Sequence, residues 1–389
     1  MRAVTILGST GSIGQSTLDV IRRRQDRFSV HALVAGRNLD RLAEQIVEFR
    51  PAVAVIETES DLTHLRDRIA ALGLERARWP DFGFGAAARV EVATAVEVDF
   101  VLSAIVGVAG LEATYEAVRA RKQIGLANKE TLVAGGALVM KAARENGVEL
   151  IPVDSEHNGA HQCLRAGRRG EVTRLILTAS GGPFRNTPKQ ALQSVTPEQA
   201  LNHPTWKMGP RITIDSATMM NKGFEVIEAC WLFDMTPAEV DVVVHPQSSV
   251  HAMVEYNDGS VVAQLSTTDM RMPIQYALTY PERWDSPAAK LDLTAALDLE
   301  FEPPDTDRFP ALELGYEVAR AGGTAGAVVN AANEAAVAGF LEGQLSFTEI
   351  VPACRAVLGQ HNYNPHPTLT ELLQLDAWAR KEITRWVCT

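Results

Sequence analysis

Three carboxylates on two separate segments have the residue type and the setting of ligands for a divalent cation. Asp154 and Glu156 follow the apolar run 148–153, which predicts a strand, and they lead into a predicted helix over 156–165. Two carboxylates at the carboxyl end of a strand can converge on one hard cation. Asp154 or Ser155 could instead cap the helix, so this segment alone leaves both interpretations open.

A second segment favours the metal interpretation. Apolar residues at helical spacing predict a helix over 217–233, with Ser216 near its N-cap. Asn221, Lys222 and Glu225 fall together on the face next to the apolar stripe. An amide and an ammonium suit a phosphate, and a carboxylate suits a metal. An exposed Lys–Glu pair one turn apart is the alternative.

A long stretch rich in Gly and Pro, residues 181–211, predicts a lid over a site. It follows Ser180 and carries His203 and Trp206 in a turn-rich loop. About 30 residues of weak structure inside a compact domain usually serve a function, and an active-site lid is the expected one. A surface histidine is the alternative for His203, whereas an exposed Trp206 is harder to explain structurally. Further along, His245 and His251 could be structural or functional.

A glycine-rich loop near the N-terminus predicts a dinucleotide site. Gly8, Gly11 and Gly14 belong to a segment that follows a predicted strand at 4–7 and opens a predicted helix at 12–24. Glycines here permit a tight turn and a close approach of the backbone to a pyrophosphate, whose charge meets the helix N-terminus. The spacing is a variant common among NADP-binding folds, and a structural loop is the alternative.

The end of the second predicted strand, 30–35, indicates which dinucleotide binds. Enzymes that use NAD usually place a carboxylate about 20 residues after the glycines, where it binds the ribose 2′-hydroxyl. Here the strand is followed by Gly36, Arg37 and Asn38. Arg37 suits a 2′-phosphate, so NADPH is the preferred cofactor, with a solvated loop arginine as the alternative.

These residues need an α/β scaffold, and strands and helices alternate over the first 153 residues. Such alternation predicts a doubly wound, Rossmann-like sheet of parallel strands, which we assign to an NADPH-binding domain at 1–153. The predicted strands are 4–7, 30–35, 52–56, 100–106, 124–127 and 148–153, and the predicted helices are 12–24, 39–50, 62–72, 111–121 and 131–146.

The pattern changes after residue 153. We expect an α+β catalytic domain at 154–281, with a mixed sheet and the flexible lid loop at about 181–211. Its strands are predicted at 172–178, 241–245, 250–256 and 260–266, the last two joined by a hairpin turn at Asn257-Asp258-Gly259. A Pro-rich linker arm at 282–309 then leads to a C-terminal helical bundle at 310–389, with helices at 311–321, 325–341, 346–358 and 369–386.

Composition narrows the class of protein. The 389 residues carry a formal net charge of −11, which argues against a nucleic-acid partner because phosphate neutralisation needs a basic face. No apolar run approaches the ~18 residues of a membrane span, and the first apolar run is too short for a signal peptide. The 4 cysteines form no short-spaced pair, which argues against a zinc ribbon or a dithiol motif. We therefore expect a cytoplasmic enzyme.

Together these segments resemble the 1-deoxy-D-xylulose 5-phosphate reductoisomerase family. Its members are NADPH- and metal-dependent enzymes that rearrange and reduce 1-deoxy-D-xylulose 5-phosphate to 2-C-methyl-D-erythritol 4-phosphate in non-mevalonate isoprenoid synthesis. The resemblance covers essentially the whole chain. The strings at 154–157 and 215–225 are highly specific and the glycine loop is not; other matching strings lie at 8–14, 127–130, 180–184, 203–206 and 245–251.

The resemblance implies a role for each matching residue. Asp154, Glu156 and Glu225 would hold the metal, Mg²⁺ or Mn²⁺, with Co²⁺ as a further candidate. The phosphorylated small-molecule substrate would contact Lys129, Ser155, Glu156, Ser180, His203, Trp206, Ser216, Asn221, Lys222 and Glu225. NADPH would contact Thr10, Gly11, Ser12, Ile13, Gly36, Arg37, Asn38, Asn128, Glu130 and Gly209. The catalytic residues would be Lys129, Asp154, Glu156, His203 and Glu225.

The resemblance also carries two structural implications. Phe224 stands where a smaller apolar residue is often found, and we expect it to alter packing only. A homodimer is implied by the resemblance alone.

Two other functions stay open from the residues themselves. A metal-free NADP-dependent dehydrogenase of a semialdehyde or hydroxy acid would share the dinucleotide loop, and a metal requirement separates it from the reductoisomerase. A non-catalytic NADPH-sensing protein would keep the fold with a degraded metal site. The intact set of Asp154, Glu156 and Glu225 disfavours this second alternative.

Overall fold

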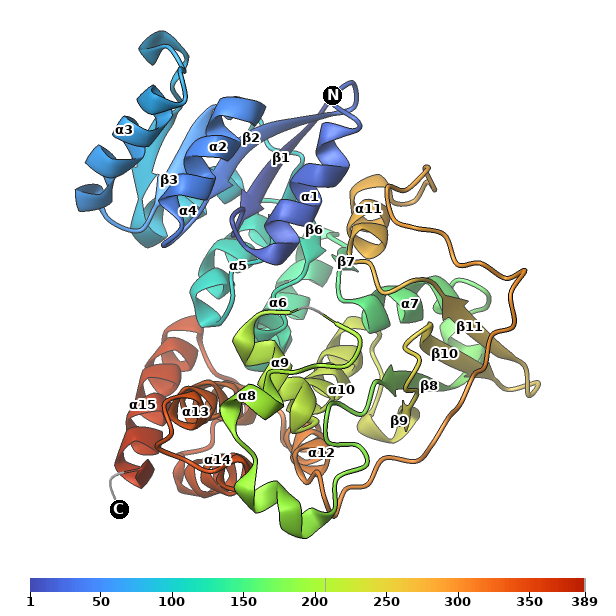
Figure 1. Cartoon of the computed structure of the whole chain (residues 1–389). Coiled ribbons are helices and arrows are strands. Elements are labelled where there is room, and N and C mark those ends of the chain that lie inside the picture. Colours follow the sequence, from blue (N-terminus) through green and yellow to red (C-terminus); the bar gives the residue numbers. More distant parts are fainter. Residues whose placement is uncertain (207, 388–389) are drawn as a thin grey trace. The chain divides into compact units, whose positions relative to one another are not determined.

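The computed structural model describes residues 1–206 and 208–387 (Figure 1). Lys207, within the predicted lid, and Cys388 and Thr389, at the end of the predicted bundle, lie outside the described residues. The chain forms two compact units. Unit 1 contains Met1–Thr131, Lys141–Asp154 and Met270–Ala288, and unit 2 contains Leu132–Met140, Ser155–Asp269 and Ala289–Thr389.

The predicted doubly wound sheet is confirmed in unit 1. Its strands lie in the order β4-β3-β2-β1-β5-β6-β7, and every neighbouring pair is parallel. The strand order reverses at β1, and open sheets of this kind bind ligands at the carboxyl ends of the strands beside such a switch point. The strands are β1 Arg2–Leu7, β2 Phe28–Val34, β3 Val53–Ile56, β4 Asp81–Phe84, β5 Phe100–Ser103, β6 Gln123–Leu126 and β7 Leu150–Pro152.

The helices of this part of the chain follow the predicted periodicity, with some exceptions. They are α1 Ser12–Arg22, α2 Leu39–Phe49, α3 Leu62–Ala71, α4 Gly85–Thr94, α5 Leu111–Arg119, α6 Glu130–Asn146 and α11 Arg271–Thr279. The sequence pattern reveals neither β4 nor α4, because β4 has no β-branched residue and its Gly83 lies directly against Ala88 of α4. It also misses α11, which lies in unit 1. The strand predicted at 100–106 is too long, since the chain turns after Ser103 and Gly107 has φ 80°.

The predicted mixed sheet is confirmed in unit 2. Its order is β11-β10-β8-β9, in which β10 is antiparallel to β8 and β11 while β8 and β9 are parallel. The hairpin turn between β10 and β11 contains Gly259 at φ 85°, as its sequence predicts. The elements are β8 Val172–Ala179, β9 Val240–Val244, β10 Val250–Tyr256, β11 Val261–Leu265, α7 Ser155–Leu164 and α8 Pro197–Ala200.

One predicted helix is wrong. The segment predicted as a single helix at 217–233 is two helices, α9 Pro210–Ala217 and α10 Met220–Leu232. They meet at Met219, whose φ of 65° interrupts the helical path. Ser216 therefore lies in the last turn of α9 and is not an N-cap. The apolar stripe hides this break because Ala217 and Met220 are both fully buried on either side of it.

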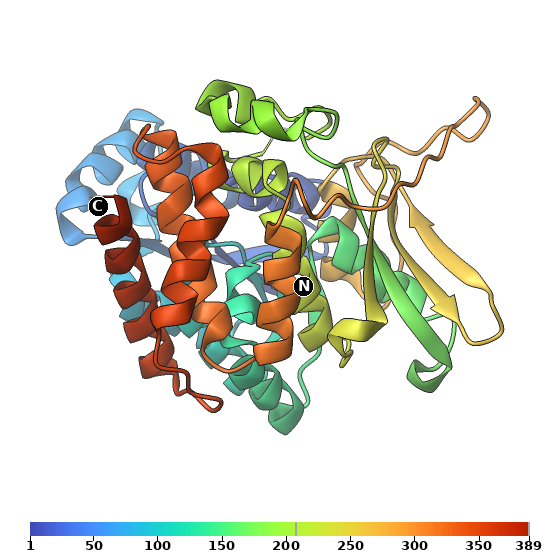
Figure 2. The same ribbon diagram turned by 90° about the horizontal axis from the view of Figure 1, so that it is seen from below.

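The predicted C-terminal helical bundle is confirmed, and it shares one hydrophobic core with the mixed sheet. Its helices are α12 Ala311–Ala321, α13 Ala325–Leu341, α14 Ile350–Gln360 and α15 Leu369–Val387, drawn in orange and red in Figure 2. Val328 of α13 and Ile383 of α15 belong to the same cluster as Leu177 of β8 and Phe224 of α10. Between α11 and α12 the structure has no helix or strand apart from an isolated bridge of Val244 with Glu302. No described helix has the length and apolar character needed to cross a membrane.

Candidate active site

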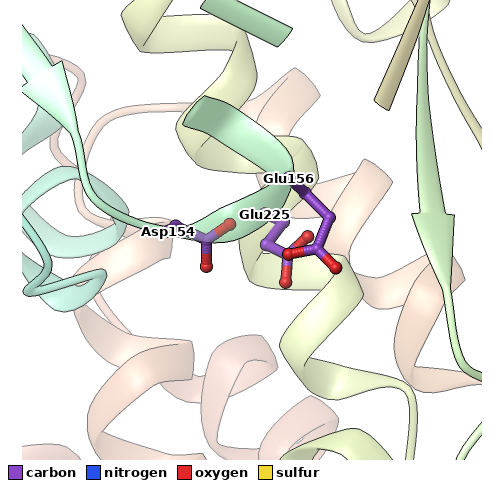
Figure 3. Close-up of side chains that lie close together, drawn as sticks. All are labelled: Asp154, Glu156 and Glu225. Carbon is purple, nitrogen blue, oxygen red and sulfur yellow. The ribbon is translucent and has the colours of Figure 1, made fainter. Parts of the chain in front are cut away.

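The structure brings the three predicted metal ligands together (Figure 3). Asp154 follows β7, Glu156 lies in the first turn of α7 and Glu225 lies on α10. One carboxylate oxygen of each lies within 4.8 Å of the others. Glu225 is fully buried, whereas the other two side chains are partly exposed. Ser155 Oγ donates to Glu156 Oε2 at 2.7 Å, so it orients this carboxylate.

Two lysines compensate part of this negative charge. Lys129 Nζ lies 2.7 Å from Asp154 Oδ2. Lys222 Nζ, which is nearly buried, donates to Glu225 Oε2 and lies 3.5 Å from Glu156 Oε1. Asn221 Nδ2 donates to the other Glu225 oxygen. Two ammonium groups against three carboxylates leave one net negative charge, and an all-oxygen donor set of this kind suits a hard divalent cation such as Mg²⁺ or Mn²⁺.

A second group of predicted residues gathers around His203. Its Nε2 lies 3.1 Å from Ser180 Oγ and 3.0 Å from Ser216 Oγ. Its Nδ1 accepts from the backbone N–H groups of Thr205 and Trp206. Because Nδ1 is an acceptor, the ring proton of the neutral histidine is on Nε2, directed at the two hydroxyls. Burial lowers the pKa of His203, which favours this neutral form.

The loop between β8 and α9 supports this second group. Gly182 has φ 66°, and a Cβ at this position would lie 2.9 Å from Ser216 O, so only glycine fits. Trp206 is half-buried, and its ring centroid lies 6.4 Å from that of His251. Gly209 is the N-cap of α9. The structure thus brings Trp206 and His251 together, which the sequence does not indicate.

His245 has a structural contact. It is fully buried, and its Nδ1 donates to Glu300 O while its Nε2 accepts from Ser249 N. These bonds attach the segment before Glu302 to the loop after β9. Of the two possibilities that the sequence leaves for His245, the structure supports the structural one.

The glycine loop has the backbone geometry of a phosphate cradle. Gly8 has φ 93°, and a Cβ there would lie 2.5 Å from Ala104 O; a Cβ at Gly14 would lie 2.4 Å from Gly8 O. The helix α1 begins at Ser12 with Gly11 as N-cap and without a side-chain cap. Its N-terminus therefore presents backbone N–H groups suited to an anion. Thr10 precedes the N-cap of α1, and Ile13 is the second residue of this helix.

Gln45 is a residue of this loop that the sequence does not indicate. It lies on α2, is buried, and donates from Nε2 to Ser9 O at 2.9 Å. It braces the glycine loop from the neighbouring helix. No signal in the sequence distinguishes it from other polar residues of α2, because its role depends on how α2 packs.

The segment after β2 has the composition expected for a 2′-phosphate site. Gly36, Arg37 and Asn38 are all exposed. Asn38 Oδ1 accepts from Arg41 N at 3.1 Å and so caps α2. The nearby carboxylate of Asp40 is paired with Arg68 at 2.6 Å. The predicted cofactor contacts of this segment stay predictions.

Asn128 and Glu130, predicted beside the nicotinamide, flank the start of α6. Asn128 is buried; its Nδ2 donates to the carbonyls of Ile105 and Gly107, and its Oδ1 accepts from Thr131 N at 2.7 Å. These bonds fix the loop after β5 to the first turn of α6. The Asn128 side chain thus has a structural role, and its predicted contact with the cofactor stays a prediction.

Comparison with protein-family models gives three consecutive matches. Residues 4–136 match 1-deoxy-D-xylulose 5-phosphate reductoisomerase, residues 150–233 match its C-terminal domain, and residues 265–382 match the DXP reductoisomerase C-terminal domain. Two curated relatives carry the same name. The relative from Solibacter usitatus is 58% identical over 380 residues (98% of this chain, 96% of the relative), and the one from Chlorobium phaeovibrioides is 51% identical over 387 residues (100% of both chains).

Solved structures agree with these matches. A DOX-P reductoisomerase in complex with NADPH, fosmidomycin and magnesium has a TM-score of 0.92 and 40% identity, covering 100% of this chain and 98% of that chain. A 1-deoxy-D-xylulose 5-phosphate reductoisomerase from Zymomonas mobilis in complex with NADPH has a TM-score of 0.91 and 44% identity, covering 99% of both chains.

Proposed function

Since this chain belongs to the 1-deoxy-D-xylulose 5-phosphate reductoisomerase family, we propose which of its residues perform the family's reaction. The chain is an NADPH- and divalent-metal-dependent enzyme that rearranges and reduces 1-deoxy-D-xylulose 5-phosphate to 2-C-methyl-D-erythritol 4-phosphate in isoprenoid precursor biosynthesis. The observation that carries the residue assignment is the convergence of Asp154, Glu156 and Glu225, with Lys222 between two of them.

Asp154, Glu156 and Glu225 are the metal ligands of this proposal. When bound, Mg²⁺ or Mn²⁺ supplies a Lewis acid for the rearrangement and NADPH supplies the hydride for the reduction. Ser155 holds Glu156 in a fixed orientation. Lys129, paired with Asp154, places its ammonium beside the ligand set, where it contacts the substrate hydroxyls.

The substrate phosphate is bound by five residues of this proposal: Ser180, His203, Ser216, Asn221 and Lys222. The Nε2–H of His203 and the two hydroxyls supply neutral donors from one cluster, and Lys222 supplies the positive charge. Lys222 contacts Glu156 and Glu225 in the structure. Its role in phosphate binding therefore requires its ammonium group to turn toward the phosphate when another cation compensates the charge of Glu225. Binding of this remote group can stabilise a closed site.

The lid at about 181–211 excludes water from the substrate. Trp206 covers the substrate and Gly209 meets the cofactor; their place in the loop that also holds His203 supports this assignment. Exclusion of water protects a reactive carbonyl compound from side reactions.

The cofactor assignment uses the glycine loop and the segments after β2 and β6. Thr10, Gly11, Ser12 and Ile13 bind the phosphates of NADPH at the N-terminus of α1. Gly36, Arg37 and Asn38 bind the 2′-phosphate, and Asn128 and Glu130 border the nicotinamide. The uncapped start of α1 and the close approach at Gly8 and Gly14 support the first part of this assignment.

We also propose that the enzyme is a homodimer. The strand β11 is an edge of the unit 2 sheet, and its Val261 and Leu265 are exposed. Exposed apolar edge strands pair with another chain unless they are covered. Sedimentation velocity should give a dimer, and Val261→Lys should shift it toward monomer; a monomeric wild type would contradict this proposal.

The enzyme is proposed to work in the cytoplasm, where thiols stay reduced. Cys163, Cys230 and Cys354 are all free thiols. Cell fractionation should recover the protein with cytoplasmic markers, and its recovery in another fraction would contradict this location.

One assay tests the proposed function. Purified protein with 1-deoxy-D-xylulose 5-phosphate and Mn²⁺ should oxidise NADPH, and EDTA should abolish this oxidation until the metal is restored. Turnover that persists in EDTA would overturn the metal assignment. NADPH binding without turnover in the presence of metal would overturn the catalytic assignment.

A further inference from the structure

Asp215 is a buried carboxylate that neither the metal cluster nor the proposed phosphate contacts use. It lies in the last turn of α9, directly before Ser216, and is 4% exposed. Its Oδ1 accepts a hydrogen bond of 2.7 Å from Asn333 Nδ2 on α13, and its Oδ2 lies 3.7 Å from Arg211 Nε, one turn earlier on α9. A buried carboxylate is unfavourable unless it is paired, so these partners determine where this turn of α9 lies.

The partners of Asp215 belong to a polar seam between α9 and α13, which we define as Arg211, Asp215, Asn330, Asn333 and Glu334. Arg211 Nη2 donates to Asn330 Oδ1 at 2.8 Å, and its Nη1 lies 3.1 Å from Glu334 Oε2. The residues are spaced by three or four along each helix, so each helix presents one polar face to the other. Both asparagines are fully buried.

The seam continues into the last helix of the chain. Glu334 Oε2 also lies 2.8 Å from Arg380 Nη2 on α15, and Arg380 pairs with Asp376 at 2.7 Å. The polar seam thus connects α9, which begins at the end of the predicted lid, to two helices of the C-terminal bundle.

The next residue of the same helical turn is Ser216. Consecutive residues of a helix point about 100° apart, so with Asp215 directed at α13, Ser216 is directed toward a different neighbour. That neighbour is His203, whose Nε2 lies 3.0 Å from Ser216 Oγ. A rotation of α9 that displaced Asp215 from Asn333 would therefore also carry the Ser216 hydroxyl away from His203.

We propose that Asp215 is a positioning residue for the phosphate contacts. Its hydrogen bond with Asn333 fixes the rotation of α9, so that Ser216 and His203 face one point. The inference rests on the proposed function, since it takes Ser216 and His203 to bind the substrate phosphate. It assigns to Asn333, a residue of the C-terminal helices, an effect on substrate binding that does not extend to NADPH or metal.

The test compares two matched variants of α13. Asn333→Ala removes the donor to Asp215. Asn330→Ala makes the same change at an equally buried position of the same helix. It removes one hydrogen bond from Arg211, and Arg211 still has its ion pair with Glu334. We expect N333A to raise the KM for substrate and the inhibition constant of inorganic phosphate about tenfold, because a hydrogen bond to a charged group is lost. We expect N330A to leave both near the wild-type values.

Further measurements separate positioning from a general structural role. N333A should keep its kcat, its NADPH affinity and its Mn²⁺ affinity near wild type. Equal KM values for N333A and N330A, or a parallel loss of NADPH and Mn²⁺ affinity in N333A, would overturn the proposal.

A second pair of variants covers the case in which N333A does not fold. Asn333→Asp should raise the KM for substrate, because two carboxylates then face each other with no donor between them. The double variant D215N/N333D should restore the KM because it re-forms the hydrogen bond with donor and acceptor exchanged. A folded double variant that fails to restore the KM would also overturn the proposal. Ser216→Ala tests the underlying assignment separately: if its KM is unchanged, the phosphate role of Ser216 is wrong whatever Asn333 does.

Discussion

Replacing Glu225 by glutamine should separate metal binding from folding. The side chain is fully buried, and Lys222 and Asn221 donate to its two oxygens. Glutamine keeps the size of the side chain and one acceptor oxygen, so Glu225→Gln should fold. The variant has one negative charge fewer in a cluster whose ligand atoms lie within 4.8 Å of one another. The other two carboxylates cannot replace this charge.

The expected loss of metal affinity follows from electrostatics. Two unit charges about 4 Å apart interact by about 4 kcal/mol at an effective dielectric constant of about 20. A divalent cation doubles this attraction, while the hydration that the ion and the carboxylate give up offsets much of it. A net loss of about 3 kcal/mol corresponds to about 100-fold in Kd. We therefore expect E225Q to bind Mn²⁺ about 100-fold more weakly.

The assay is a Mn²⁺ titration followed by electron paramagnetic resonance of the free ion, with NADPH binding measured by fluorescence in parallel. The matched control is Glu228→Gln, one turn further along α10. Glu228 is also buried, but its Oε2 lies 3.3 Å from His157 Nδ1 and it is outside the carboxylate cluster. E228Q should stay within about tenfold of wild type. Wild-type Mn²⁺ affinity in E225Q, or equal losses in both variants, would refute the reasoning, and a loss of NADPH binding would make Glu225 a structural residue.

Three further predictions concern the cofactor and the lid histidine. Arg37→Asp should weaken NADPH binding far more than NADH binding in fluorescence titrations, because it replaces the cation proposed to bind the 2′-phosphate by an anion; an unchanged preference would contradict this role. Gly14→Ala places a Cβ 2.4 Å from Gly8 O, so it should weaken NADPH binding at least about tenfold while Mn²⁺ affinity stays unchanged. Burial lowers the pKa of His203 from 6.5, so just below pH 6.5 the unfolded chain binds a proton that the folded chain does not, and stability falls as the pH drops through this range. His203→Gln should flatten the slope of unfolding free energy against pH there; an unchanged slope in denaturant titrations would contradict the assignment.

Much of the fold is readable from local sequence because burial imposes a period on each element. Helices such as α12 and α13 begin and end at the residues that the apolar periodicity predicts, since one face of each must be apolar. The alternation of strands and helices predicts the parallel sheet of unit 1, because a helix between two strands brings the chain back to start the next strand in the same direction. The prediction fails where the period is weak or misleading, as at β4 and α4. It also fails at Met219, where a single positive φ divides one apolar stripe between two helices.

Residue types and local spacing already define the available chemistry: an all-oxygen set in Asp154, Glu156 and Glu225, glycines that permit a tight loop, and an arginine where a carboxylate would select NAD. Residue type and local spacing carry this information because they fix charge, donor number and backbone freedom. The spatial contacts between these groups depend on how the helices and strands pack. The packing of α10 places Glu225 beside the other two carboxylates. Asp215 accepts a hydrogen bond from Asn333 because α9 lies against α13. Such contacts join segments far apart in the chain, and no local period encodes them.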